Sequence, residues 1–346
     1  MEEKKKALLI KLSSLGDVIF NIPLANALQK SGYEVHWLTS EKGVDVLKGN
    51  PCIDRVIIAP FYKWKRQGFF KSFREYLKIL NTIRRQKYDL VIDTQGRWRS
   101  LIFSAFSGVK KRLAGSDGKE FSRFGATDIV KMPSGWNINI ADKYLLYAKY
   151  LGIEGNSQDM TLPDTSAKTD RITEFLQGID REKPVAVLSP STTWKTKYWD
   201  KDNWKELVCE INERFNLIFT GTKKDVEYIN YIRGNSGINL AGKTDILDLV
   251  ELFKRSDIVI SLDSGSTHLA RAARAKAIIA IFCSTPESYY APIGEKYFAL
   301  GGKLECRPCH KRKCNSTNKM ACTKLPEVRE VLDIINKIYT GVTIQG

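Results

Sequence analysis

The sequence predicts an α/β protein built from two doubly wound domains. Three observations indicate this fold class: short β-branched apolar runs that are continuous rather than alternating, amphipathic stretches between them, and a polar, turn-rich segment near the middle. Continuous apolar strands are buried on both faces, as in a parallel sheet, and helices connect such strands. At 346 residues the chain is also too long for one compact core.

The strand and helix pattern occurs once in each half of the chain. In the first half we expect strands at residues 7–12, 35–39, 55–58 and 90–93, with helices at 18–30, 70–86 and 142–151. In the second half we expect strands at 185–189, 217–220, 258–261 and 277–282, with helices at 204–214, 224–234, 245–255 and 267–273. The polar segment 154–184 predicts a linker. It would separate domains at 1–165 and 166–325, followed by a terminal helix within 326–346.

Charge is concentrated in the first half. Between Phe61 and Phe124 there are 16 Lys and Arg against 5 Asp and Glu, a net charge of +11 within a chain of net charge +16. Such a field attracts an anionic partner: nucleic acid, a phosphorylated glycolipid or an anionic membrane face. The alternative is a solvated surface that keeps the protein soluble.

The N-terminus and the hydropathy pattern bear on location. The opening MEEKKKALLIKL is too short and too charged for a signal peptide, and no apolar run approaches the roughly 18 residues of a membrane span. We therefore expect a cytoplasmic protein whose contact with a membrane is peripheral.

The stretch KLSSLGDVIF, residues 11–20, joins a predicted strand to a predicted helix. Ser13 or Ser14 could cap the helix, and Gly16 permits close backbone approach. Asp17 then lies in the first helical turn, where the helix dipole favours the ionised carboxylate. Such a carboxylate, aimed into a cleft, can accept a proton from a sugar hydroxyl. The alternative is an acid that only stabilises the helix terminus.

Two loops of the second half predict a phosphate-binding site. In SPSTTWKTKYW three hydroxyls (Ser191, Thr192 and Thr193) and two lysines (Lys195 and Lys197) can bind phosphate oxygens. The alternative is a turn with an aromatic core cluster. In SLDSGSTHLARAA the backbone amides of residues 264–266 open a helix and form an anion site. Asp263 could orient that loop, and His268 is either a structural hydrogen-bonding residue or part of the site.

A third loop completes the predicted nucleotide site. In FTGTKKDVEY a strand ends before Gly221 and Thr222, and the helix that follows bears Asp225 and Glu227. An acid just beyond a strand can bind ribose hydroxyls. Since ligands of doubly wound sheets bind beyond the carboxyl ends of the strands, these loops together predict a nucleotide-diphosphate site. We expect it to face Asp17 across a cleft between the domains.

Three motifs in this order resemble the lipopolysaccharide heptosyltransferases, glycosyltransferase family 9: K-x-S-S-L-G-D-V-I, T-T-W-K-T-K-Y-W-x-x-x-N-W and S-L-D-S-G-S-T-H-L-A. The resemblance covers nearly the whole chain. It implies a GT-B fold, two Rossmann-like domains facing a cleft, with a C-terminal helix that returns to the N-terminal domain. It also implies an inverting transfer that requires no metal or other cofactor, from ADP-heptose to the Kdo or heptose of the lipid A inner core.

The family's functional residues carry over onto matching positions. The resemblance makes Asp17 the general base and Lys197 a catalytic residue at the phosphate, while Asp225 stands where the family more often has a ribose-binding Glu. The implied donor-binding residues are Thr192, Thr193, Gly221, Thr222, Asp225, Asp263, Ser264, Gly265, Ser266 and His268. The implied acceptor-binding residues are Ser14, Gly16, Lys63, Lys65, Arg66, Arg99 and Lys119.

Four cysteines lie close together with the spacing C-x2-C-x4-C-x7-C: Cys306, Cys309, Cys314 and Cys322. Four thiolates can hold structural zinc or iron, and relatives that glycosylate autotransporter proteins have a similar iron site. Free thiols that pack a loop are the alternative, and a reducing compartment disfavours disulfides.

Two other functions fit parts of the pattern. One retains the fold but uses another nucleotide-sugar or a protein acceptor, as in autotransporter-type heptosyltransferases. The other is a basic nucleic-acid-binding protein, against which stand the missing aromatic RNP pattern and the missing zinc-finger spacing. We therefore expect an ADP-heptose donor, an anionic glycolipid acceptor and no nucleic acid.

Overall fold

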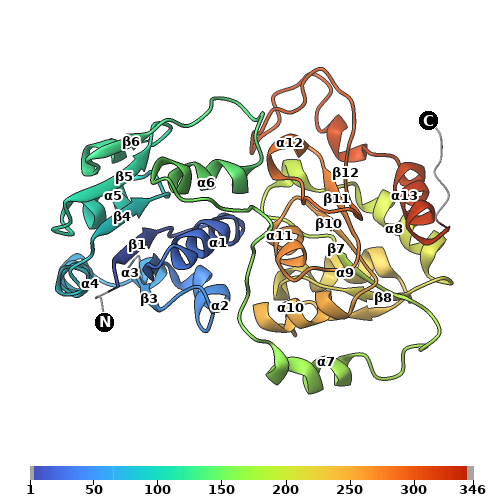
Figure 1. The fold of residues 1–346 in the computed structure, drawn as a ribbon. Helices are drawn as coiled ribbons and strands as arrows, with labels where there is room; N and C mark the ends of the chain where they lie inside the picture. The colour runs from blue at the N-terminus through green and yellow to red at the C-terminus, as the bar shows by residue number, and fades with distance from the viewer. Residues whose placement is uncertain (1–3, 65, 120, 341–346) are drawn as a thin grey trace. The chain divides into compact units, whose positions relative to one another are not determined.

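The chain forms two compact units, Met1–Asp164 and Thr165–Gly346. The computed structural model describes residues 4–64, 66–119 and 121–340, and Figure 1 shows the arrangement of elements within each unit. The division between the units falls inside the polar segment 154–184.

The first unit is a parallel sheet with helices packed against it. Its strands are β1 (Lys6–Ile10), β2 (Glu34–Thr39), β3 (Arg55–Ile58), β4 (Leu90–Asp93), β5 (Lys111–Gly115) and β6 (Asp128–Val130). Its helices are α1 (Leu15–Lys30), α2 (Val44–Leu47), α3 (Phe61–Trp64), α4 (Phe69–Arg85), α5 (Trp98–Ala105) and α6 (Ile140–Tyr150), with 3-10 turns η1 (Glu41–Gly43) and η2 (Ser122–Gly125).

The second unit repeats this construction. Its strands are β7 (Val185–Ser189), β8 (Asn216–Phe219), β9 (Ile238–Asn239), β10 (Ile258–Leu262), β11 (Ile278–Phe282) and β12 (Tyr297–Gly301). Its helices are α7 (Thr169–Phe175), α8 (Lys201–Ile211), α9 (Val226–Arg233), α10 (Ile246–Arg255), α11 (Gly265–Ala272), α12 (Glu287–Tyr290) and α13 (Val328–Thr340). The 3-10 turns are η3 (Ser166–Lys168), η4 (Lys195–Lys197), η5 (Lys223–Asp225) and η6 (Ala321–Lys324).

Both sheets have the same strand order. Among the described residues the first sheet runs β3-β2-β1-β4-β5-β6, and the second runs β9-β8-β7-β10-β11-β12, with all pairs parallel. In each sheet the order reverses between its first and fourth strands, β1 and β4 in one and β7 and β10 in the other. Loops at the carboxyl ends of such strands diverge and leave room for a ligand.

The predicted central strands are confirmed because each is a largely apolar run that is buried on both faces. The five residues of β7, VAVLS, and the five of β10, IVISL, are all buried. Helix α1 is also buried from Val18 to Leu28 and packs against α6 as well as the sheet, which explains its apolar sequence on all sides.

The C-terminal helix, α13, packs in the second unit against α8 and β12. The reason is its apolar side: Val331 and Ile335 are fully buried in the core that also contains Trp199 and Trp204. The Trp199 indole N–H donates to the carbonyl of Pro326 at 2.8 Å and holds the start of the helix in place. The expected return of the C-terminal helix to the N-terminal domain stays a prediction.

The hydropathy of the described helices bears on membrane insertion. None of the helices between residues 4 and 340 is both long and apolar enough to cross a bilayer.

Candidate active site

Asp17 lies where the sequence predicts it, in the first turn of α1 after β1. Ser14 is the N-cap residue, and both its backbone N–H and its hydroxyl donate to Asp17 Oδ2, at 3.0 and 2.8 Å. Gly16, also in the first turn of α1, lies between them and is buried. About a third of the Asp17 side chain remains exposed, at 32%. The carboxylate is therefore held in place but still accessible.

Two groups beside Asp17 were not predicted, Lys11 and Tyr144. The Lys11 ammonium lies 3.8 Å from Asp17 Oδ1, and the Tyr144 hydroxyl donates to the same oxygen at 3.3 Å. Lys11 in turn donates to the Tyr144 hydroxyl at 2.7 Å. Burial raises the pKa of Asp17, whereas the Lys11 charge and the hydrogen bonds from Ser14 lower it. The lowering effects are larger, so the pKa of Asp17 lies below its ordinary value. Asp17 is thus ionised at neutral pH.

A pocket of about 350 Å³ opens beside this turn in the first unit. Its lining combines hydroxyl, aromatic and cationic side chains: Leu12, Ser13, Ser40, Phe61, Tyr62, Gln95, Arg97, Trp98 and Arg99. Gln95 Oε1 accepts hydrogen bonds from the backbone N–H groups of Leu12 and Ser13, at 2.9 and 3.1 Å, and so ties the β4 loop to the β1 loop. The two arginines make the pocket suitable for an anionic ligand.

The predicted acceptor-binding cations are placed differently from one another. Arg99 lines the pocket, with its guanidinium 5.6 Å from the Phe61 ring centroid. The Lys119 backbone N–H donates to Gly96 O at 2.9 Å, which brings its loop to the β4 loop. Lys63 is exposed but is paired with Glu75 at 3.0 Å.

The other two predicted acceptor-binding cations are Arg66 and Lys65. Arg66 is exposed just after α3, and its backbone N–H donates to Lys63 O. Lys65 lies outside the described residues. Their roles as acceptor-binding residues stay predictions.

In the second unit Lys197, Asp263 and His268 come together at the carboxyl ends of β7 and β10. Lys197 Nζ lies 2.6 Å from Asp263 Oδ2, and His268 Nε2 lies 3.5 Å from Asp263 Oδ1. Burial raises the pKa of Asp263, but hydrogen bonding to His268 and the Lys197 charge outweigh it, so the pKa is well below its usual range. Burial lowers the pKa of His268 despite the carboxylate beside it, so the ring is neutral at pH 7.

Residues that sequence reasoning missed support this cluster. Thr285, after β11, donates to Asp263 Oδ2 at 2.6 Å. The Lys197 ammonium lies 4.7 Å from the Trp194 ring centroid and 5.6 Å from that of Tyr290. Thr285 and Tyr290 are far from Lys197 in sequence, and no spacing rule connects them to it.

The remaining predicted phosphate-binding groups surround the start of α11. Ser264 is the N-cap residue, and Gly265 and Ser266 form the first turn. The Ser264 Oγ is buried and has no hydrogen-bond partner among the described residues. Thr192 donates to Asp263 O at 3.4 Å, whereas Thr193 is exposed in the same loop. The helix terminus thus has free hydrogen-bonding capacity beside a fixed lysine.

Asp225 has a local role in the structure. Its Oδ2 accepts from the Thr222 backbone N–H at 2.7 Å and from the Thr222 hydroxyl at 2.6 Å. Gly221 packs against it, because a Cβ there would lie 3.1 Å from Asp225 Cβ. Asp225 therefore shapes the β8 loop, and its contact with a ribose stays a prediction.

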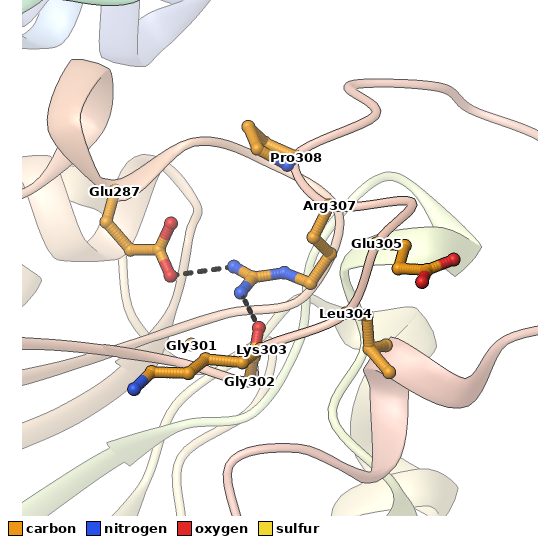
Figure 2. Close-up of a pocket in the computed structure, with 8 residues that line it drawn as sticks. All are labelled: Glu287, Gly301, Gly302, Lys303, Leu304, Glu305, Arg307 and Pro308. Carbon is orange, nitrogen blue, oxygen red and sulfur yellow. Dashed lines mark hydrogen bonds and ion pairs between the residues drawn. The ribbon is translucent and has the colours of Figure 1, made fainter.

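The cysteine loop is anchored by Arg307. Figure 2 shows Arg307 reaching Glu287, at 2.8 Å, and the carbonyl of Gly302. It also donates to the carbonyl of Cys283. Arg307, Glu287 and Gly302 line a pocket of about 540 Å³ at the end of β12. A Cβ at Gly301 would collide with the side-chain ends of Glu287 and Arg307, so those side chains would have to shift. Because its guanidinium is already satisfied, Arg307 acts as a structural clamp.

The four cysteines of this loop differ in exposure. Cys306 is exposed, Cys309 and Cys314 are half-buried, and Cys322 is buried. Burial raises the pKa of Cys322, and the neighbouring thiol of Cys309 adds to the effect. Within the described residues no three His, Cys, Asp or Glu side chains form a group that could hold a metal ion. As placed, the thiols do not form a ligand set, and a structural metal here stays a prediction from the sequence.

Comparison with known proteins agrees with this arrangement. The model of glycosyltransferase family 9 (heptosyltransferase) matches residues 76–320. Lipopolysaccharide heptosyltransferase 1 of Pseudomonas aeruginosa is 25% identical over 324 residues, covering 89% of this chain and 87% of that protein. A family 9 glycosyltransferase from Veillonella parvula matches with a TM-score of 0.80 and 18% identity over 99% of both chains.

A ligand-bound structure has the same fold. The Escherichia coli heptosyltransferase WaaC with ADP-2-deoxy-2-fluoro heptose matches with a TM-score of 0.71 and 19% identity, covering 96% of this chain and 99% of that one. The two Rossmann-like domains of the GT-B fold are thereby confirmed. The chain belongs to glycosyltransferase family 9, the heptosyltransferases, and is a glycosyltransferase.

Proposed function

We propose that the protein transfers a heptose from ADP-heptose to the Kdo or heptose of a lipopolysaccharide inner core, with inversion at the anomeric carbon. The names of its relatives and the ADP-heptose analogue bound to WaaC support this donor and this pathway. The observation that carries the proposal is the Asp17 carboxylate, which is kept ionised by Lys11 and Ser14 yet remains accessible beside a cationic pocket.

The second unit would hold the donor. Departure of ADP leaves negative charge on the diphosphate, which Lys197 and the N-terminal amides of α11 can stabilise. Asp263 supports this role because it fixes the lysine at 2.6 Å before any ligand arrives. No step of this scheme requires the cysteine loop.

The first unit would hold the acceptor. A hydroxyl of the acceptor sugar loses its proton to Asp17 as its oxygen attacks C1 of the donor heptose, and the bond from C1 to the phosphate oxygen breaks. Arg97 and Arg99 in the adjacent pocket suit the carboxylates and phosphates of an inner core. Because that acceptor is anchored in a membrane, we place the protein at the cytoplasmic face of the inner membrane.

The test is a transfer assay with ADP-heptose and a Kdo-containing acceptor. Asp17→Asn should lower kcat by about 10²- to 10⁴-fold, the usual contribution of a general base, while ADP still binds. The matched control is Asp142→Asn, which removes a first-turn acid from α6 and should leave the rate unchanged. An Asp17→Asn variant within tenfold of the wild-type rate would remove the proposed base.

A structural zinc or iron at the four cysteines is a separate proposal. Metal analysis of protein purified without metal-affinity resin tests it, and a content below about a tenth of an equivalent would count against it.

A further inference from the structure

Helix α4 exposes an apolar stripe to solvent. Phe70 is 87% exposed, Phe73 52% and Leu77 41%, although most large apolar side chains of the unit are buried. These three residues follow the spacing i, i+3, i+7, so they lie along one side of the helix. The opposite side, with Tyr76, Ile79 and Ile83, packs on the core of the sheet. The exposed stripe is therefore a surface feature rather than a poorly packed core.

A basic stripe runs beside the apolar one. Lys71, Arg74 and Lys78 are all exposed and follow the same i, i+3, i+7 spacing. Each is one residue beyond a member of the apolar stripe, so the basic stripe lies about 100° farther round the helix. We call the six residues of the two stripes the α4 face. An apolar strip flanked by cations is typical of helices that lie in a membrane interface.

Exposed aromatic residues continue onto the neighbouring segments. Phe106, at the end of α5, is 54% exposed, and Phe121 and Phe124 of the η2 segment are 78% and 81% exposed. Arg84 of α4 donates to the carbonyl of Phe106 at 2.7 Å, and α5 packs against η2. Figure 1 shows α4 at one side of the first unit. Aromatic side chains are thus exposed on three segments that contact one another in turn: α4, the end of α5 and η2.

We propose that the α4 face docks on the surface of an anionic lipid bilayer. Phe70, Phe73 and Leu77 enter the boundary between headgroups and acyl chains, and the basic stripe pairs with lipid phosphates. This inference deepens the proposed function, since it supplies the membrane contact that a lipid-anchored acceptor requires.

Charge complementarity favours a bilayer over a second copy of this chain or a nucleic acid as the partner of the α4 face. A second copy of this chain would bring two basic stripes together, and their repulsion opposes such a dimer. Nucleic acid would use the cations but has little need for exposed aliphatic Leu77, since bases stack on aromatic rings. A bilayer with anionic headgroups uses both stripes at once.

The experiment measures binding of the full chain to phosphatidylcholine vesicles made with and without phosphatidylglycerol. One variant carries Phe70→Ser and Phe73→Ser, and a second carries Lys71→Gln, Arg74→Gln and Lys78→Gln. Both should bind phosphatidylglycerol vesicles at least about tenfold more weakly than the wild type. Added salt should weaken wild-type binding. The control, Ile293→Ser, removes an exposed apolar side chain from the second unit and should bind like the wild type.

A second measurement separates docking from folding and catalysis. Both α4 variants should transfer heptose to a deacylated, water-soluble acceptor at the wild-type rate. Loss of vesicle binding with this rate retained supports the proposal. Vesicle binding that is unchanged in the α4 variants overturns the proposal, as does wild-type binding that is equally strong to neutral vesicles. The proposal is also overturned if the variants change only self-association, measured by light scattering, or only RNA binding. Vesicle binding that depends on the α4 face without any transfer would instead refute the proposed function alone.

Discussion

Replacing Lys197 with methionine separates its structural contribution from its proposed contact with the diphosphate. Methionine preserves most of the aliphatic length but leaves Asp263 without its cation. The side chains are 14% and 2% exposed, and their charged atoms lie 2.6 Å apart. The variant therefore leaves a carboxylate in a site from which water is largely excluded.

The expected loss of stability follows from the burial of this ion pair. Removing one partner of a buried ion pair costs about 3–5 kcal/mol. Thr285 and His268 still hydrogen-bond to the carboxylate, so we expect the lower end, about 3 kcal/mol. For a unit of this size that is a fall in Tm of roughly 6–12 °C. The pKa of Asp263 in the folded protein lies below its unfolded value, so its stabilisation is complete at pH 7 and is lost only as the pH falls below about 4.

Thermal unfolding and ADP titration calorimetry at pH 7 provide the readouts. The double variant Lys197→Met, Asp263→Asn removes both charges and should recover most of the Tm, yet it should still bind ADP weakly. Lys195→Met, at an exposed lysine two residues earlier, should match the wild type in stability. A Lys197→Met protein that melts within about 1 °C of the wild type would refute the buried-pair reasoning. A double variant that binds ADP normally would refute the phosphate contact.

Three further outcomes are expected. Ile335→Ala should lower the free energy of urea unfolding by about 2–5 kcal/mol, because Ile335 is fully buried in the second core, and a loss below about 1 kcal/mol would contradict the placement of α13. Burial raises the pKa of Asp93 to about 6, so its ionisation destabilises the folded state as the pH rises from about 4 to 6. The stability of Asp93→Asn relative to wild type should increase over that range, and a constant difference would argue against the raised pKa. Arg307→Met should release the cysteine loop, because Arg307 holds it to the carbonyl of Cys283. Alkylation of Cys322, which is only 8% exposed, should then become about tenfold faster when followed by mass spectrometry. An unchanged alkylation rate would show that the clamp is dispensable.

Most of the strands that could be predicted are buried on both faces. Strands such as β4, LVID, and β11, IIAIF, are fully buried and begin with three or more consecutive apolar residues, which suffice to identify them. The strands that were missed are the edge strands β6, β9 and β12 and the inner strand β5, which begins with Lys111 and Arg112. Edge strand β6 has three residues and begins with Asp128, and all five residues of β12 are only half-buried. An edge strand has one neighbour and less surface to bury, so its apolar signal is weak.

The same contrast holds for the site. Asp17 was predictable because its placement depends on neighbours in sequence, a serine cap and a first helical turn. Its other partner, Tyr144, is 127 residues away and reaches it only because α6 packs on α1. The sequence likewise indicated Lys197 and Asp263 separately, as members of two loops.

By itself, the sequence determined the class of fold, the central strands, the motifs of family 9 and the position of Asp17 on its helix. These depend on local periodicity and capping, which act over a few residues. Only the tertiary structure decided that α13 covers the second core, that Lys11 and Tyr144 contact Asp17, and that Lys197 pairs with Asp263. Apart from the contact between Lys11 and Asp17, which are close in sequence, these contacts join segments far apart in the chain. The order of strands in each sheet and the packing of helices bring those segments together.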